Sequence, residues 1–250
     1  MRFIITFLLL VLSLSGCQQD THKEKRIDYS QIKISDSIQA SSELESIISP
    51  YRNKLKNEMN QPLTYSPKSL YKTDYPLNTP IGNLMADAVF EMSNPIFKKR
   101  EQKQIDAVLL NYGGIRAGIN KGEVTVRTAF NIMPFENQVI IAELPYSSLK
   151  KMIDYLVQER KAHPISGMQI VLDQNRSLQS ATINNQPLQK DKNYYIATSD
   201  YLFNGGDNMN FFNDAISSYD IDYKLRNLFI DYFQQQDTLP IVHDKRFIQK

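Results

Sequence analysis

The chain is poor in the residues that define several protein classes. Its 250 residues include one cysteine and three histidines, which argue against a disulfide framework and against a zinc site built from either residue. Nine glycines and eleven prolines exclude collagen-like and low-complexity chains. Lysine and arginine total 29 against 27 for aspartate and glutamate, so the chain lacks the basic excess of a nucleic-acid-binding protein. The composition fits a globular protein with a substantial core.

The first seventeen residues have the pattern of a bacterial lipoprotein leader. Arg2 precedes an apolar run, Phe3–Leu14, that is too short to span a bilayer and fits the hydrophobic part of a signal peptide. The run leads into Leu14-Ser15-Gly16-Cys17, which resembles a lipobox whose cysteine is lipidated and becomes the mature N-terminus. The only cysteine therefore falls where the lipid would be attached. The alternative is a signal peptide cleaved without lipidation, with Cys17 there by chance.

The sequence after Cys17 predicts a tether followed by one domain. Residues 18–40 are polar and mixed in charge, and residues 41–250 contain no second linker and no repeat. No further stretch of 18 or more apolar residues follows, so we expect a lipid to hold the protein at a membrane face. Gln18 stands where an aspartate is linked to inner-membrane retention, which favours the outer membrane of a bacterial cell envelope. A leader at residue 1 leads us to expect that no other domain precedes this one.

Apolar periodicity predicts four helices in the domain. Ser42 and Glu45 have the spacing of a capping box, and apolar residues recur at helical spacing from Leu44 to Leu55. Pro50 is expected to kink this helix or to divide it into two. The other helices are predicted over residues 82–92, after an N-cap at Ser147 and after an N-cap at Asp220.

Short apolar runs predict five strands, at Ile105–Leu110, Val139–Leu144, Met168–Leu172, Leu178–Ile183 and Tyr194–Thr198. Helices and strands do not alternate regularly along the chain. This order favours an α+β fold, in which a mixed β-sheet is flanked by helices.

Three polar loops carry the residues suited to ligand binding. The first, Asn111-Tyr112-Gly113-Gly114-Ile115-Arg116, follows a predicted buried strand. Its paired glycines allow backbone N–H groups to approach an anion, and Arg116 offers a planar set of donors suited to a phosphate or carboxylate. No Gly-Lys-Ser or Gly-Lys-Thr follows, so this is not a P-loop. The alternative is a tight turn with a solvated arginine.

The second loop, Asn204-Gly205-Gly206-Asp207, ends in an aspartate. A carboxylate can accept hydrogen bonds from two sugar hydroxyls, as acidic residues do in dinucleotide sites. The alternative is an aspartate-containing turn.

The third loop, Met133-Pro134-Phe135-Glu136-Asn137, carries an aromatic residue in polar surroundings. The ring of Phe135 could stack on a nucleobase, which is worth roughly 1–3 kcal/mol. The alternative is a core phenylalanine under the loop. Together the three loops outline a nucleotide site.

Five segments resemble, in the same order, the C-terminal domain of bacterial and animal 5′-nucleotidases, a family that includes UDP-sugar hydrolases and 2′,3′-cyclic-nucleotide phosphodiesterases. They are ISPYRNKL (residues 48–55), GNLMADA (82–88), NYGGIR (111–116), MPFEN (133–137) and YLFNGGD (201–207). The resemblance extends from about Leu44 to Phe247.

The resemblance implies roles for nine residues. Asn111 and Arg116 match residues that hold the substrate phosphate, and Phe135 matches one of two aromatic plates that bind the base. Tyr201 stands where the family usually has the second plate, commonly phenylalanine, and Asp207 matches the carboxylate that contacts the ribose. Glycines that shape the two loops are matched by Gly113, Gly114, Gly205 and Gly206.

One part of the pattern is missing. The family usually places an arginine seven residues before the glycine of its GNL motif, with a glutamate between. Here Tyr75 and Asn78 occupy those positions. Lys72 lies in the same segment and could contribute a positive charge, although a lysine is a point charge without the planar fork of arginine.

The resemblance also implies a larger N-terminal metallophosphatase domain, which binds two metals through Asp-x-His and Gly-Asn-His motifs and uses them to activate water. Neither motif occurs in residues 41–250, and the single Asp-x-His sequence, at residues 20–22, lies in the tether. We therefore expect no metal, no cofactor and no catalytic residue in this chain. Divalent metals are expected only on a partner metallophosphatase.

Three functions are compatible with these features. The first is the substrate-recognition half of a 5′-nucleotidase-type hydrolase in nucleotide catabolism, working with a separate metallophosphatase chain. The second is a membrane-tethered lipoprotein of the periplasm that binds nucleotides or nucleosides without catalysis. The third is a degenerate domain kept as a scaffold. In each case we expect the isolated chain to be inactive as a hydrolase.

Overall fold

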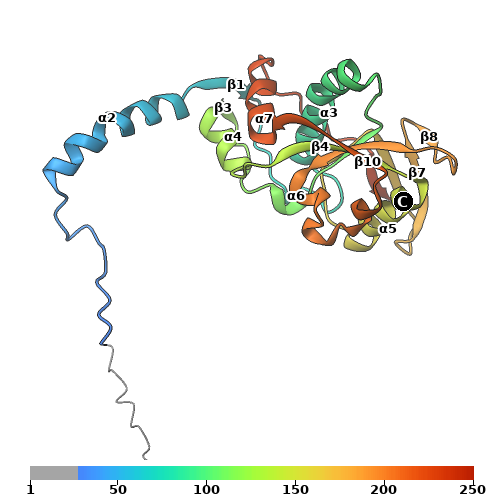
Figure 1. Ribbon diagram of the computed structural model, residues 1–250, viewed down its shortest axis with the longest axis horizontal. Coiled ribbons are helices and arrows are strands. Elements are labelled where there is room, and N and C mark those ends of the chain that lie inside the picture. Colours follow the sequence, from blue (N-terminus) through green and yellow to red (C-terminus); the bar gives the residue numbers. More distant parts are fainter. Residues whose placement is uncertain (1–27) are drawn as a thin grey trace, which may run out of the picture. The chain divides into compact units, whose positions relative to one another are not determined.

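The computed structural model describes residues 28–250 and divides the chain into two units, which meet between Ile47 and Ile48 (Figure 1). The predicted leader, its lipobox Cys17 and the first part of the tether lie outside the described residues. In the first unit, residues 28–41 form no regular element beyond a turn near Ser37. Among the described helices, none combines the length and the hydropathy needed to cross a bilayer.

Helix α2 (Ser42–Met59) runs without interruption through Pro50. The prediction of two short helices is therefore wrong, because proline removes only one backbone donor from the ladder. The hydroxyl of Ser41 accepts the first free N–H, from Leu44, at 3.4 Å, so the cap lies one residue before the predicted Ser42. The helix buries none of its side chains.

A five-stranded mixed sheet forms the centre of the second unit, in the order β10-β4-β9-β2-β5. Strand β9 (Tyr194–Ser199) lies in the middle, parallel to β2 (Ala107–Leu109) and antiparallel to β4 (Gln138–Leu144). The outer strands β10 (Ser217–Lys224) and β5 (Ile165–Ser166) pair antiparallel with β4 and β2. The mixed sheet confirms the predicted α+β class.

Two smaller sheets complete the unit. One has the order β11-β6-β7-β8, in which β6 (Met168–Leu172) and β7 (Leu178–Ile183) form a hairpin extended by β8 (Gln186–Pro187). The C-terminal strand β11 (Phe247–Gln249) joins its edge parallel to β6. The other sheet pairs β1 (Pro62–Ser66) with β3 (Gly122–Thr125).

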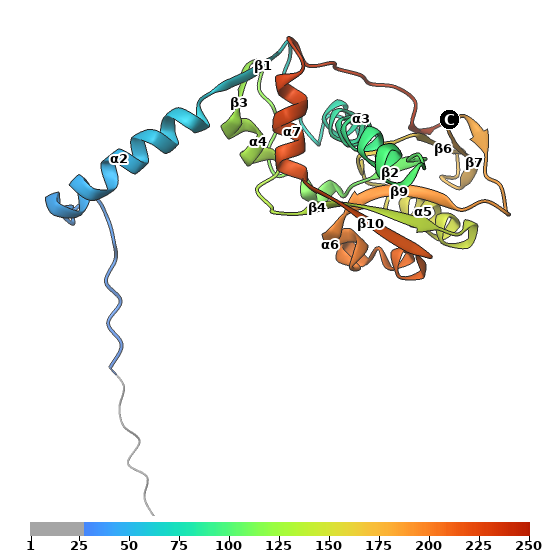
Figure 2. The ribbon, with the colours of Figure 1, turned by 45° about the horizontal axis from the view of Figure 1, so that its top comes forward.

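Helices cover both faces of the central sheet (Figure 2). Alternate residues of β2 contribute to two separate cores, Val108 to one and its neighbours Ala107 and Leu109 to the other, as the two-residue period of a strand requires. Helices α3 (Pro80–Glu101), α4 (Val126–Ile132) and α7 (Leu225–Gln234) pack into the first core. Helix α5 (Tyr146–Glu159), the short α6 (Asp200–Phe203) and a 3-10 turn at Asn210–Asp214 pack into the second.

Three predicted helix boundaries need correction. Helix α3 begins at Pro80, where the hydroxyl of Thr79 accepts the N–H of Gly82, and extends to Glu101, well beyond Met92. Helix α5 begins at Tyr146 after Pro145, so Ser147 lies inside it and is no cap. Asp220 lies in β10, opposite Ile140 of β4, and α7 starts only after Lys224. Strand pairing with β4 thus outweighs the capping tendency of that aspartate.

Candidate functional site: a polar and aromatic cavity at one edge of the central sheet

Sheet topology brings the three predicted loops together. Because β2 and β9 are parallel, the loops that follow them, which carry NYGGIR and NGGD, leave the same edge of the sheet. Strand β4 runs antiparallel to β9, with Val139 opposite Ser199, so the MPFEN loop that precedes β4 lies at that edge too. Residues far apart in sequence therefore meet at one place.

A cavity of about 270 Å³ lies between these loops. Seven of the nine predicted site residues line it: Asn111, Gly113, Gly114, Arg116, Phe135, Tyr201 and Asp207. The eighth lining residue, Asn137, was not among the predicted site residues, although it ends the MPFEN segment. Gly205 and Gly206 do not line the cavity, and they act by shaping its wall.

Asp207 is held in place from three sides. Its carboxylate accepts hydrogen bonds from the amide of Asn111 at 2.7 Å and from the hydroxyl of Tyr201 at 3.0 Å. The hydroxyl of Tyr155 donates to its backbone carbonyl at 2.9 Å. The carboxylate also raises the pKa of Tyr201, because it accepts the phenolic proton. The aspartate is thus fixed, with acceptor capacity left for hydroxyl groups of a ligand.

The NGGD loop takes a conformation that needs glycine. Gly205 has a φ of 87° and Asp207 a φ of 52°, both in the left-handed region. A Cβ atom on Gly206 would lie 2.5 Å from ring atoms of Tyr201. The missing side chain therefore lets the Tyr201 ring pack close to Gly206 while its hydroxyl reaches Asp207.

The NYGGIR loop closes a 3-10 turn over Tyr112–Gly114. A Cβ on Gly114 would lie 2.5 Å from the side-chain oxygen of Asn111, so glycine is required for Asn111 to turn toward Asp207. Arg116 follows, with its backbone N–H donating to the carbonyl of Ile132 at 2.9 Å. Among residues 28–250, the hydrogen bond recorded for its guanidinium is a long one, 3.5 Å to the carbonyl of Gly113, so donors stay free for an anion.

The two aromatic residues of the site are half-exposed. Phe135 is 39% exposed and Tyr201 47%, so the alternative of a core phenylalanine at Phe135 is wrong. The guanidinium of Arg116 lies 5.8 Å from the centroid of the Phe135 ring. Ring faces open to solvent are suited to stacking on a planar ligand.

Ion pairs hold the loop that carries Phe135. The carboxylate of Glu136 pairs with Lys224 at 2.5 Å and with Arg226. Arg226 also donates to the carbonyl of Phe135 at 3.3 Å, and its guanidinium lies 4.2 Å from the centroid of the Phe130 ring. The hydrogen bonds from Lys224 and Arg226 lower the pKa of Glu136 to about 2. These contacts hold Phe135 and its loop against the start of α7.

Lys72 contacts the loop that contains Arg116. Its ammonium donates to the carbonyl of Ile115 at 2.9 Å and lies 4.5 Å from the ring centroid of Tyr112. Burial, together with the charge of Arg116, lowers the pKa of Lys72. A second cation thus approaches the NYGGIR loop, as its position in the sequence suggested.

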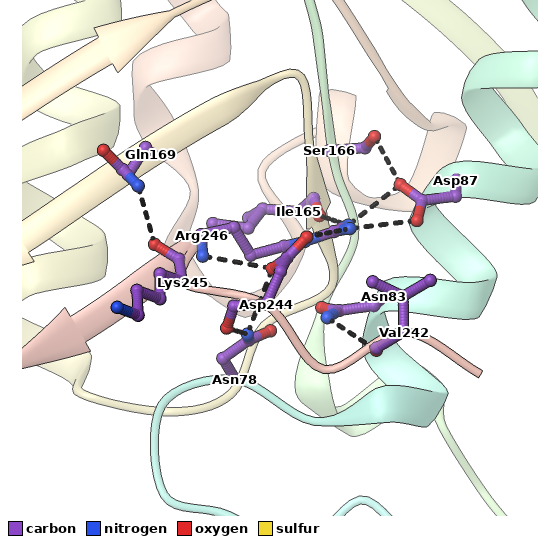
Figure 3. Close-up of polar contacts among 10 residues, drawn as sticks. All are labelled: Asn78, Asn83, Asp87, Ile165, Ser166, Gln169, Val242, Asp244, Lys245 and Arg246. Carbon is purple, nitrogen blue, oxygen red and sulfur yellow. Dashed lines mark hydrogen bonds and ion pairs between the residues drawn. The ribbon is translucent and has the colours of Figure 1, made fainter. Parts of the chain in front are cut away.

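Tyr75 and Asn78, at the positions of the missing arginine and glutamate, have other partners. The ring of Tyr75 stacks on His243, with centroids 3.9 Å apart and planes 16° apart. The amide of Asn78 donates to the carbonyl of Asp244 at 2.7 Å (Figure 3). Neither residue lines the cavity described above, so its cationic groups come from Arg116 and from Lys72 nearby.

His163 lies under the site without lining it. The N–H of Tyr112 donates to its Nδ1 at 3.2 Å, and burial lowers its pKa to about 4. It is therefore neutral at pH 7 and acts as a fixed acceptor for the NYGGIR loop. Within residues 28–250, no three histidine, cysteine, aspartate or glutamate side chains are grouped so that they could hold a metal ion. That divalent metals belong to a partner stays a prediction.

The described unit is an α+β domain in which glycine-containing loops bring a carboxylate, a guanidinium and two half-exposed aromatic rings to one cavity. Residues 64–214 match the family model described as the 5′-nucleotidase, C-terminal domain. This match covers more than half of the chain, which therefore belongs to the 5′-nucleotidase C-terminal domain family.

Relatives agree with this assignment. The chain is 23% identical over 223 residues to the trifunctional nucleotide phosphoesterase protein YfkN of Bacillus subtilis and 24% identical over 213 residues to the 5′-nucleotidase of Mus musculus. The alignments cover 82% and 76% of this chain but only 15% and 37% of those proteins. The crystal structure of a 5′-nucleotidase precursor from Thermus thermophilus has the same fold, with a TM-score of 0.68 at 20% identity over 82% of this chain and 42% of that one. The chain thus spans well under half of each of these relatives.

Proposed function

We propose that this domain binds a nucleotide and serves as the substrate-recognition half of a 5′-nucleotidase-type phosphohydrolase in nucleotide catabolism. The observation that carries the proposal is the meeting of Arg116, Phe135, Tyr201 and Asp207 in one cavity. These four side chains offer an anion donor, two aromatic faces and a hydroxyl acceptor, which are the groups that recognise phosphate, base and sugar.

Each part of a nucleotide has a counterpart in the cavity. The base stacks on the rings of Phe135 and Tyr201, and the ribose hydroxyls donate to Asp207. The phosphate lies toward the guanidinium of Arg116, and Asn111 fixes the position of Asp207 through its hydrogen bond to the carboxylate. These residues bind and orient a substrate, and none of them is placed to activate water.

The chemistry of hydrolysis belongs, in this proposal, to a separate metallophosphatase chain. That partner would supply two divalent metals, which activate water and stabilise the leaving oxygen. We further propose that Cys17 carries a lipid and holds the protein in the bacterial cell envelope, at the outer membrane, where the two chains would meet.

Calorimetric titration of the full chain tests nucleotide binding. Adenosine, AMP and UDP-glucose should bind saturably, and Phe135→Ala should weaken adenosine by about 5- to 150-fold, as expected for loss of one stacked base. Tyr51→Ala removes a 74% exposed aromatic side chain on α2 and is the matched control. Unchanged affinity in Phe135→Ala would refute the stacking assignment.

A mixing experiment tests the role of a partner. Phosphate release from AMP is measured for a metallophosphatase that lacks this domain, for this chain and for the two together. We expect activity to rise only in the mixture, and to fall again when this chain carries Asp207→Asn. Equal rates with and without this chain would contradict the split-enzyme proposal.

A second function, binding of nucleosides without catalysis, is supported by one observation. Tyr75 stacks on His243 where the family usually has a phosphate-binding arginine, so the site holds fewer cations than the family pattern. If AMP and adenosine bind with equal affinity, this second function gains support. Failure to bind either ligand at millimolar concentration would favour the third possibility, a scaffold.

A further inference from the structure

A second cavity of about 600 Å³ shares no lining residue with the first. Four segments far apart in sequence form it: residues 75–78, the end of α5, the β6–β7 hairpin and residues 243–249. Its apolar wall is made by Leu77, Leu172, Phe247 and Ile248. The volume and the mainly apolar wall are typical of sites that bind small molecules.

A partly buried ion-pair network fixes the segments that carry this wall (Figure 3). Arg246 donates to both carboxylate oxygens of Asp87, at 2.9 and 3.0 Å, and to Asp244 at 2.8 Å. Asn78 donates to the carbonyl of Asp244, which joins residues 75–78 to the C-terminal segment. The cavity therefore exists before any ligand binds, and a ligand would not have to order its walls, which would otherwise reduce the affinity.

Three cations on the rim lack a counter-charge in the described part of the chain. Arg160, Arg176 and Lys245 line the cavity, and none of them forms an ion pair with residues 28–250. The acidic side chain that lines the cavity, Asp244, is already bonded to Arg246. The rim is thus positive, and two of its cations are arginines, whose planar donors suit a phosphate or a carboxylate.

The wall also presents a flat aromatic surface. Tyr75 and His243 stack face to face, and Tyr75 is still 46% exposed. A planar ring can pack against the pair and against the apolar residues beside it. Aromatic surface and uncompensated cations at one cavity select ligands that combine a ring with a negative charge.

We propose that this second cavity binds an aromatic organic anion, with its ring against Tyr75 and the apolar wall and its phosphate or carboxylate on Arg160, Arg176 and Lys245. The site is independent of the nucleotide cavity and of any catalytic partner.

Calorimetry with three matched probes tests this site on the full chain. 1-Naphthyl phosphate and 1-naphthoate share a ring and differ in the anion, and 1-naphthol has the ring without the charge. At least one anion should bind saturably and at least about tenfold tighter than 1-naphthol, as expected for one charge-assisted hydrogen bond. The tighter of the two anions identifies the group that the cations prefer.

Single substitutions locate the binding. Arg176→Gln and Lys245→Gln should each weaken binding of the anion about tenfold, and Tyr75→Leu should weaken binding of all three probes. Lys190→Gln, which removes an equally exposed lysine elsewhere, and Arg116→Gln, which disables the nucleotide cavity, should change nothing. No saturable binding of either anion, equal binding of 1-naphthol, or loss of binding in Arg116→Gln would overturn the proposal. The first cavity is also proposed to bind a ring and an anion, so Arg116→Gln separates the two sites: binding that is kept in this variant and lost in Arg176→Gln belongs to the second cavity.

Discussion

At the scale of single residues, the site depends on one carboxylate with several fixed neighbours. Asp207 accepts from Asn111 and Tyr201 through different oxygens, and its backbone is held by Tyr155. An amide in its place has one acceptor oxygen, so one of the two donors would lose its acceptor or, for Tyr201, have to accept from the new NH2 group. The Asp207→Asn variant used above therefore tests ligand contact and internal support of the cavity together.

The glycines offer a sharper comparison, because one tolerates a side chain and another does not. A Cβ on Gly206 would lie 2.5 Å from the Tyr201 ring, whereas on Gly113 the nearest atom would lie at 3.4 Å. Gly206→Ala should therefore displace the ring of Tyr201 and weaken adenosine about tenfold or more. Gly113→Ala should keep the thermal stability of the parent. A Gly206→Ala variant with full adenosine affinity would contradict the packing described here.

His163 gives the molecule a pH-dependent stability. Its folded pKa of about 4 lies below the ordinary value of 6.5, so the unfolded chain binds more protons between these values. Stability should therefore be complete above about pH 6.5 and fall as the pH drops toward 4. Between pH 7 and pH 5, the free energy of unfolding measured with urea should fall by about 2 kcal/mol more for the parent than for His163→Asn. The Oδ1 of that asparagine can still accept the Tyr112 N–H. Equal losses would contradict the assignment of His163 as a buried neutral base.

At the scale of elements, strands and helices hold the loops that line the proposed binding site. The MPFEN loop is fastened by Glu136, which pairs with Lys224 at the end of β10 and Arg226 in α7. Since Arg226 also holds the Phe135 carbonyl, the ion pair sets the position of the aromatic plate. Glu136 is thus a positioning residue that need not touch a ligand.

A double-mutant cycle checks this positioning role. Glu136→Gln should weaken adenosine about fivefold, from a coupling of ~1 kcal/mol, and should have no further effect when Phe135→Ala is already present. Glu123→Gln, an exposed glutamate in β3, is the control. If the two losses simply add, Glu136 does not act through Phe135.

Comparison of predicted and observed strands shows which parts of the fold could be predicted from the sequence. Short apolar runs predicted β4, β6, β7 and β9 closely, because a strand's alternation is local information. The cap assigned to Asp220 was wrong, because the pairing of β10 with β4 is a contact between distant residues. Likewise, the three loops could be named from sequence, but their meeting at one edge follows from parallel and antiparallel pairing, which no local pattern encodes.

Other site features had no sequence signal of their own. Asn137 lines the cavity directly before β4, and no local pattern singles it out. The stacking of Tyr75 on His243 joins residues 168 positions apart. Such contacts are decided by tertiary packing.

At the scale of the whole molecule, the proposed role of the domain is substrate recognition. It belongs to the 5′-nucleotidase C-terminal domain family, whose relatives compared above are much longer proteins. Its two cavities are separate, and the described residues offer no grouped metal ligands.

The most direct test of the proposed nucleotide site is a crystal structure of the chain with AMP. We predict the base against the rings of Phe135 and Tyr201, the ribose hydroxyls within hydrogen-bonding distance of Asp207, and the phosphate beside Arg116. AMP bound elsewhere, or in this cavity with its base away from both rings, would contradict the account.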